Sequence, residues 1–174
     1  VFGIMVLKNS EIPDKRKYKY RVVFQGNRVV DQSWQQAIFQ DLGSSPASME
    51  SGKMLDFIGR NKGYSIQQAD AEQAYVQADL TGPPTWVYIP EEGWPNEFWN
   101  WSGEVGKSKK LGPKYHRPVV KLEKALYGHP DAGTLWEVHC DRKLKACNFV
   151  PIPTWPSCYY HAGMKLTLSV YVDD

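Results

Sequence analysis

The chain has 174 residues, of which 42% are hydrophobic and 23% charged, and its formal net charge is +2. These values fit one globular domain, or one lobe of a larger one, with a hydrophobic core, and they exclude a disordered chain and a strongly basic one. No apolar run approaches the roughly 18 residues of a membrane span, and no signal peptide is evident. The three cysteines lack the spacing of a disulfide scaffold, which favours a reducing compartment.

The first half of the chain predicts a hairpin followed by a helix, a strand and a second helical stretch. The hairpin has β-rich residues on both sides of a polar turn, and helical spacing of hydrophobic residues begins after Ser48, a suitable N-cap. The predicted bounds are 1–8 and 18–24 for the hairpin strands, 49–60 for the helix, 64–70 for the strand and 71–80 for the second helical stretch.

The second half predicts short strands around a long surface excursion, then one well-defined helix and a final hairpin. The excursion is rich in Gly, Pro, Lys and Trp, and connections of this length are usually functional or mobile. The helix has hydrophobic residues at helical spacing, and Asn148 is a suitable C-terminal cap. The predicted bounds are 86–89 for a strand, 91–118 for the excursion, 119–122 for a strand, 134–147 for the helix, and 158–161 with 166–172 for the hairpin. Because strands and helices are mixed without strict alternation, the fold class is α+β.

Positive charge is concentrated in two short stretches, although the chain as a whole is nearly neutral. Such stretches are either patches that face phosphate groups or solvated loops, and the residue pattern leaves both interpretations open. The members are Lys15, Arg16, Lys17, Lys19 and Arg21 in the first stretch, and Lys107, Lys109, Lys110, Lys114, His116 and Arg117 in the second.

Three carboxylates carry the strongest chemical signal. Asp173 and Asp174 directly follow the last predicted strand, and Asp70 ends the strand predicted at 64–70. Two adjacent carboxylates after a strand most often belong to a solvated turn, but a third carboxylate favours a cation site. If the two strands lie side by side, the three side chains converge and suit two magnesium ions, the arrangement used for in-line phosphoryl transfer.

Through these residues the chain resembles the reverse transcriptases of Copia-type LTR retrotransposons over essentially its whole length. The resemblance rests on segments that follow one another in the family's order. They are KYRVVFQG at 19–26, QADAEQAYV at 68–76, VYIPEEGW at 87–94, VKLEKALYG at 120–128, Trp136 with Asn148-Phe149, and the catalytic box Tyr171-Val172-Asp173-Asp174.

The resemblance implies a reverse transcriptase fingers-and-palm fold, with an antiparallel palm sheet packed on helices and cut off at the catalytic hairpin. The implied bounds are about 1–26 for the fingers hairpin, about 64–90 and 119–174 for the palm elements, and about 91–118 for the excursion. The implied function is RNA-directed DNA polymerase activity, in which a two-metal reaction joins a dNTP to a primer 3′-hydroxyl.

The resemblance also implies roles for individual residues. Asp70, Asp173 and Asp174 are the expected catalytic carboxylates, which with the Ala71 carbonyl would hold two Mg²⁺ ions, or Mn²⁺ in their place. Tyr75 is expected beneath the incoming sugar, where its ring would exclude a ribose 2′-hydroxyl, and a core tyrosine on an amphipathic helix is the alternative. The other expected nucleotide-binding residues are Lys19, Arg21, Ala74, Tyr127 and Gly128, and the expected template-primer contacts are Tyr171 and Val172.

The expected partners are an RNA or DNA template with its primer, dNTP, and the thumb, RNase H and integrase portions of a polyprotein, without membrane contact. A Copia-type element would place the protein in a cytoplasmic virus-like particle whose product complex reaches the nucleus. The segment His129-Pro130-Asp131 departs from the family pattern, which also suits a catalytically dead, nucleic-acid-binding remnant. An unrelated metal-dependent phosphotransfer enzyme is the third hypothesis, and as an isolated piece the chain is expected to show little polymerase activity.

Overall fold

The structure, a computed structural model, describes residues 1–39, 45–102 and 109–171, and every strand pair within them is antiparallel. The strands are β1 (Phe2–Lys8), β2 (Lys17–Val23), β3 (Trp86–Tyr88), β4 (Trp99–Ser102), β5 (Lys109–Pro113), β6 (Val119–Lys121), β7 (Val150–Pro151), β8 (Cys158–His161) and β9 (Leu166–Ser169). They form the two-stranded ribbons β1–β2, β3–β6 and β4–β5 and one three-stranded sheet in the order β7-β8-β9. The helices are α1 (Met49–Gly59), α2 (Ala74–Gln77) and α3 (Ala132–Ala146). This mixture of helices and antiparallel strands confirms the predicted fold class.

Local sequence signals place both long helices correctly. Helix α1 begins after Ser48, whose side-chain oxygen accepts a hydrogen bond from the Ser51 N–H at 3.2 Å, so Ser48 is the N-cap. Helix α3 is followed by Asn148 in the left-handed conformation (φ +65°), which is common just past a helix C-terminus. The hairpins β1–β2 and β8–β9 also form where they were predicted.

The strand predicted at 64–70 is wrong, because these residues are extended and exposed but pair with no strand in the described part of the chain. A strand needs a neighbouring strand with which it can form hydrogen bonds. Beside β9 that place is taken by α1 and the residues before it, where the Ala47 N–H donates to Val170 O at 3.0 Å. The helical stretch predicted at 71–80 shrinks to the single turn of α2. Gln73 before it has φ of +52° and Ala78 after it returns to an extended conformation, so both ends are interrupted.

The excursion predicted at 91–118 has structure of its own in its described residues. Two single turns of 3₁₀-helix at Glu91–Gly93 and Asn96–Phe98 lead into the β4–β5 ribbon. The rings of Trp94 and Trp99 pack with their centres 5.1 Å apart, and the Trp94 indole N–H donates to Ile89 O at 2.7 Å. The tryptophans of this segment therefore pack locally.

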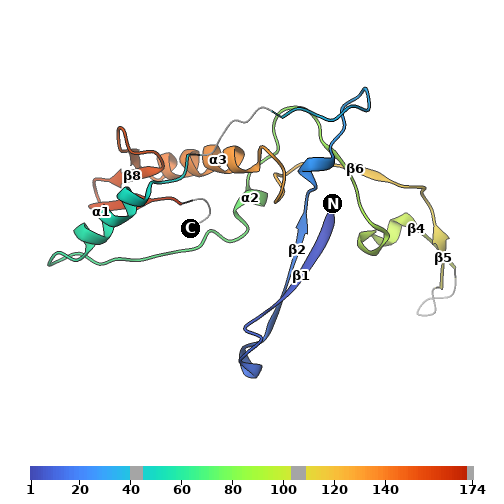
Figure 1. Ribbon diagram of the computed structural model, residues 1–174, viewed down its shortest axis with the longest axis horizontal. Helices are drawn as coiled ribbons and strands as arrows, with labels where there is room; N and C mark the ends of the chain where they lie inside the picture. Colours follow the sequence, from blue (N-terminus) through green and yellow to red (C-terminus); the bar gives the residue numbers. More distant parts are fainter. Residues whose placement is uncertain (40–44, 103–108, 172–174) are drawn as a thin grey trace.

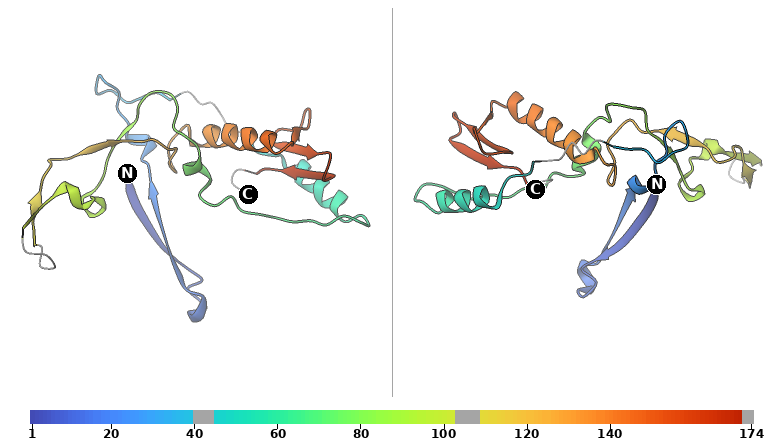
Figure 2. Two further views of the ribbon diagram at one scale, coloured as in Figure 1. Left: turned by 180° about the vertical axis from the view of Figure 1, so that it is seen from behind. Right: turned by 45° about the horizontal axis from the view of Figure 1, so that its top comes forward.

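The molecule is elongated, and most of its side chains are at the surface. Figures 1 and 2 show α1, α3 and the three-stranded sheet at one end, the β1–β2 hairpin projecting from the middle, and the arm with β4 and β5 at the other end. The chain exposes 13535 Å², whereas a compact monomer of 19.9 kDa exposes about 8,700 Å². The core is small and lies where α2 meets α3, around Ala78, Ala125 and Ala132. None of the described helices combines the length and the apolar character that crossing a membrane requires.

Candidate active site

The β1–β2 hairpin joins the rest of the chain at Tyr127 and Gly128. Phe24, which follows β2, is buried, and its N–H donates to Tyr127 O at 2.7 Å. Gly128 has φ of +86°, and a Cβ atom there would lie 2.3 Å from the Phe24 carbonyl oxygen. Glycine is therefore required both by the backbone conformation and by the close approach of the hairpin. This junction brings two segments about 100 residues apart into contact.

Arg21, Tyr127 and Tyr75 lie in series across this junction. The guanidinium carbon of Arg21 is 5.6 Å from the Tyr127 ring centre, and the rings of Tyr127 and Tyr75 meet edge to face with centres 4.8 Å apart. A cation–π contact at an exposed site contributes about 0.5–1 kcal/mol, and an aromatic pair about 0.5–1.5 kcal/mol. The structure thus brings together three predicted nucleotide-binding side chains from three separate segments.

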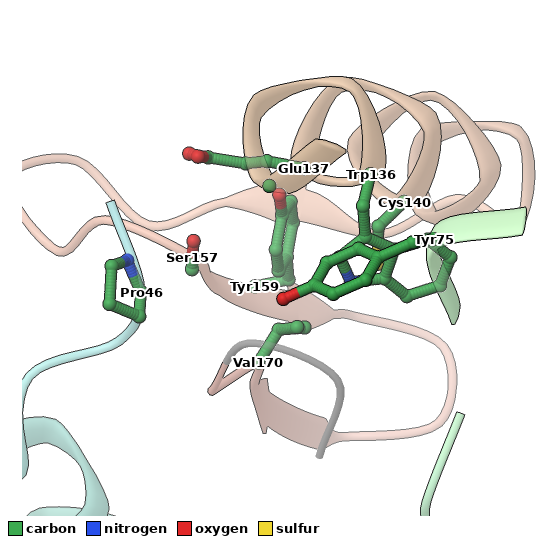
Figure 3. Close-up of a pocket in the computed structure, with 9 residues that line it drawn as sticks. Pro46, Tyr75, Trp136, Glu137, Cys140, Ser157, Tyr159 and Val170 are labelled. Carbon is green, nitrogen blue, oxygen red and sulfur yellow. The ribbon is translucent and has the colours of Figure 1, made fainter. Parts of the chain in front are cut away.

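Tyr75 projects from α2 toward the end of β9. Its neighbour Ala74, also a predicted nucleotide-binding residue, is fully buried. Ala74 therefore anchors the turn on the core and offers no exposed surface to a ligand. Figure 3 shows the Tyr75 hydroxyl pointing into a cavity of about 30 Å³, opposite Tyr159 and near Val170. That volume suits a single water molecule. The Tyr75 ring packs against the small core while its hydroxyl faces the cavity, which agrees with a core tyrosine, and its place beneath an incoming sugar stays a prediction.

Lys19 and Asp70 lie within electrostatic reach of each other. The pKa of Lys19 is lowered mainly by the neighbouring positive charges of Arg21 and Lys8, and the carboxylate of Asp70 acts in the opposite direction. Asp70 is exposed, so water screens this interaction and it contributes little to stability. Its importance is positional, since it places the carboxylate predicted to hold metal near the hairpin residue Lys19.

The acidic pair Asp173 and Asp174 lies outside the described residues, as does Val172, so their distance from Asp70 is not described. The described chain ends at Tyr171, which is exposed. Val170 before it is held by two backbone hydrogen bonds, donating to Ser157 O at 2.8 Å and accepting from the Ala47 N–H at 3.0 Å. Because Val170 lines the same cavity as Tyr75, the strand that leads to the acidic pair ends beside Tyr75.

Asp70 has the donor chemistry of a magnesium ligand. Hard divalent cations take carboxylate and carbonyl oxygens, and the exposed Asp70 side chain with the following Ala71 carbonyl fits that preference. No three His, Cys, Asp or Glu side chains of the described residues are close enough together to hold a metal ion. The other two expected metal ligands, Asp173 and Asp174, lie outside the described residues.

His129 is a residue of this region whose place the sequence did not indicate. Its buried ring lies between Phe24 and Phe39, with ring centres 5.0 Å and 5.6 Å away. The Asp131 N–H donates to Nδ1 at 3.2 Å, and Nε2 lies 3.4 Å from the Thr85 hydroxyl oxygen. Burial lowers the pKa of His129, which keeps the ring neutral and Nδ1 free to accept. His129, which departs from the family pattern, therefore packs as a neutral ring against Phe24 and Phe39 next to the junction.

Comparison with known proteins agrees with the resemblance seen in the sequence. A family model described as reverse transcriptase (RNA-dependent DNA polymerase) matches residues 4–174. The matched stretch includes the β1–β2 hairpin from Ile4 onward, Tyr75, the Tyr127-Gly128 step and the acidic pair. No solved structure matches the chain.

Proposed function

Because the chain belongs to the reverse transcriptase (RNA-dependent DNA polymerase) family, we propose that it is the polymerase region of a Copia-type retrotransposon polyprotein. In the proposed reaction the oxygen of a primer 3′-hydroxyl attacks the α-phosphorus of a dNTP and forms a new P–O bond. The bond from the α-phosphorus to the oxygen that bridges to the β-phosphate breaks, pyrophosphate leaves, and the hydroxyl proton passes to solvent. The observation that carries this proposal is the series Arg21, Tyr127 and Tyr75 beside Gly128, with Lys19 near Asp70. Residues that the resemblance assigns to nucleotide binding come from distant segments and meet in one place.

Each of these residues has a role that its chemistry supports. Lys19 and Arg21 present positive charge on one face of the β1–β2 hairpin, where a triphosphate would accept charge-assisted hydrogen bonds. At Gly128 the missing side chain lets the base of the hairpin approach, and the proposed contact of Gly128 with a nucleotide would be made through its backbone. The Tyr75 ring is fixed by Tyr127 and would lie beneath the sugar, where a 2′-hydroxyl would clash with it.

The proposed metal ligands are Asp70, the Ala71 carbonyl, Asp173 and Asp174. Two Mg²⁺ ions, when bound, lower the pKa of the primer hydroxyl and stabilise the charge that develops on the phosphate oxygens. The chain's own contribution is to orient the triphosphate through Lys19 and Arg21.

Primer extension by the chain within its polyprotein tests this function. Asp70→Asn and Asp173→Asn should each lower template-directed synthesis by orders of magnitude, because either change removes an anionic metal ligand. Asp56→Asn is the matched control, since Asp56 is an exposed carboxylate on α1 to which the resemblance assigns no role. Full activity of the Asp70 variant would refute the assignment. Template binding without extension by the unaltered protein, in either Mg²⁺ or Mn²⁺, would favour the catalytically dead remnant.

Nucleotide selection gives a second readout of the same site. Tyr75→Ala should lower the preference for dNTP over rNTP about tenfold or more, because the ring that excludes the 2′-hydroxyl is gone. Tyr75→Phe keeps the ring and should keep the preference. Equal selectivity of the alanine and phenylalanine variants would show that Tyr75 serves only as packing.

A further inference from the structure

The β3–β6 ribbon has one buried face and one exposed face in the described chain. Trp86 is paired opposite Lys121, and Tyr88 opposite Val119. Since side chains alternate along a strand, these four share one face. Trp86 is 61% exposed, whereas Val87 between the two aromatic residues is only 5% exposed. We call Trp86, Tyr88, Val119, Lys121 and the adjoining Arg117 the outer ribbon face.

Arg117 is held over this face by the backbone before β6. It has φ of +48°, which is uncommon for a residue with a side chain, and its guanidinium carbon lies 5.9 Å from the Tyr88 ring centre. A guanidinium stacked on an aromatic ring keeps its N–H groups at the edge, where they can donate to a phosphate. Arg117 therefore offers a preorganised positive charge beside an aromatic surface.

The second cation of the outer ribbon face is Lys121. It lies 3.5 Å from a carboxylate oxygen of Glu123, and both side chains are exposed. Exposed ion pairs of this kind contribute little and exchange partners at low cost. Lys121 can therefore leave Glu123 for a phosphate oxygen.

We propose that the outer ribbon face binds single-stranded nucleic acid. Proteins that bind single strands combine aromatic rings, on which bases stack, with positive side chains that follow the phosphates. Trp86 supplies the exposed ring, and Arg117 and Lys121 supply the charges on either side. Lys121 distinguishes this occupant from a protein partner, because lysine is depleted in protein–protein interfaces, whereas a phosphate accepts its charge.

The outer ribbon face lies close to the candidate active site. Figure 1 shows β6 where the arm that carries β4 and β5 leaves the middle of the molecule. Only six residues lead from Lys121 to Tyr127, and an extended chain of that length spans at most about 20 Å. A strand on the outer ribbon face would thus lie within a few nucleotides of the candidate active site. The inference rests on the proposed function and adds a surface for the unpaired template, and its test requires neither a metal nor dNTP.

The test measures binding of the 174-residue chain to fluorescently labelled dT₂₀ and U₂₀ by anisotropy, without divalent cations. Trp86→Ala should weaken binding about fivefold or more, because one stacked base loses its platform. Trp34→Ala is the matched control, since Trp34 is 85% exposed and lies outside this face, and it should leave the Kd unchanged. Trp86→Phe, which keeps a ring, should retain most of the affinity.

The charges are tested through the salt dependence of the same binding. Arg117→Gln should make the slope of log K against log [salt] shallower by about 0.7, the value expected for loss of one phosphate contact to a single strand. Arg60→Gln, an exposed arginine at the end of α1, should leave the slope unchanged. The arginine variants also decide the question if Trp86→Ala does not fold.

Three outcomes would overturn the proposal. They are an unchanged Kd for a folded Trp86→Ala, an unchanged salt slope for Arg117→Gln, and a dimer of the chain that Trp86→Ala converts to monomer. The last result would place a second copy of the chain on the outer ribbon face. None of them would refute the polymerase assignment, which is tested separately through Asp70 and primer extension.

Discussion

Gly128→Ala tests the junction on which the candidate active site depends. An alanine at φ of +86° is destabilised by roughly 1–2 kcal/mol from its own backbone conformation. Its Cβ would also lie 2.3 Å from the Phe24 carbonyl oxygen, so the base of the hairpin must move away. That movement strains the 2.7 Å hydrogen bond from Phe24 to Tyr127, which is worth about 0.5–1.5 kcal/mol. The free energy of unfolding should therefore fall by about 1.5–3.5 kcal/mol.

Gly63→Ala is the matched control for this substitution. Gly63 has φ of +92°, and a Cβ there would meet nothing within 4 Å. It shares the conformational penalty and the reduced entropy of the unfolded chain, but not the contact with the hairpin. Urea unfolding followed by circular dichroism should show about 1 kcal/mol or more between the two variants. Equal destabilisation would refute the close approach of Phe24 to Gly128. In the polymerase assay, Gly128→Ala should raise KM for dNTP, whereas Gly63→Ala should not.

Three further predictions concern single side chains. Ser48→Ala should lower stability by about 1 kcal/mol in urea unfolding because the Ser51 N–H loses its cap, and an unchanged midpoint would argue against the cap. Burial lowers the pKa of His129, so its stabilising contribution is present above about pH 6.5 and is lost as the pH falls. Unfolding midpoints should therefore drop between pH 7.5 and 5 in the unaltered chain, and they should drop less in His129→Leu. Burial and the hydrogen bond to Asp141 raise the pKa of Tyr159, so one phenol should ionise after the other tyrosines in an ultraviolet titration, and Tyr159→Phe should remove that late step.

The elements that the sequence predicted well are those whose signals are local. The first hairpin, α1 after Ser48 and α3 before Asn148 need only alternation, helical spacing and cap residues over a few positions. The junction could be anticipated only through the family resemblance, because no spacing rule relates segments so far apart. Its predicted nucleotide-binding residues are Lys19, Arg21, Tyr75, Tyr127 and Gly128.

The features that the sequence missed depend on tertiary context. Residues 64–70 carry strand-forming side chains, yet no partner strand lies beside them in the described chain. His129 became a buried, doubly hydrogen-bonded ring because Phe24 and Phe39 enclose it, and both are distant in the sequence. The acidic pair at 173 and 174 remains a prediction, since those positions lie outside the described residues.

The large exposed surface has a thermodynamic consequence for the isolated chain. With 13535 Å² already in water when folded, the chain buries only about three quarters of the area that a compact chain of its mass buries. The denaturant m-value and the heat-capacity change on unfolding both scale with newly exposed area, so each should be about a quarter smaller than the length of the chain suggests. Its melting transition would accordingly be broad, and any partner that covers the exposed faces would sharpen it.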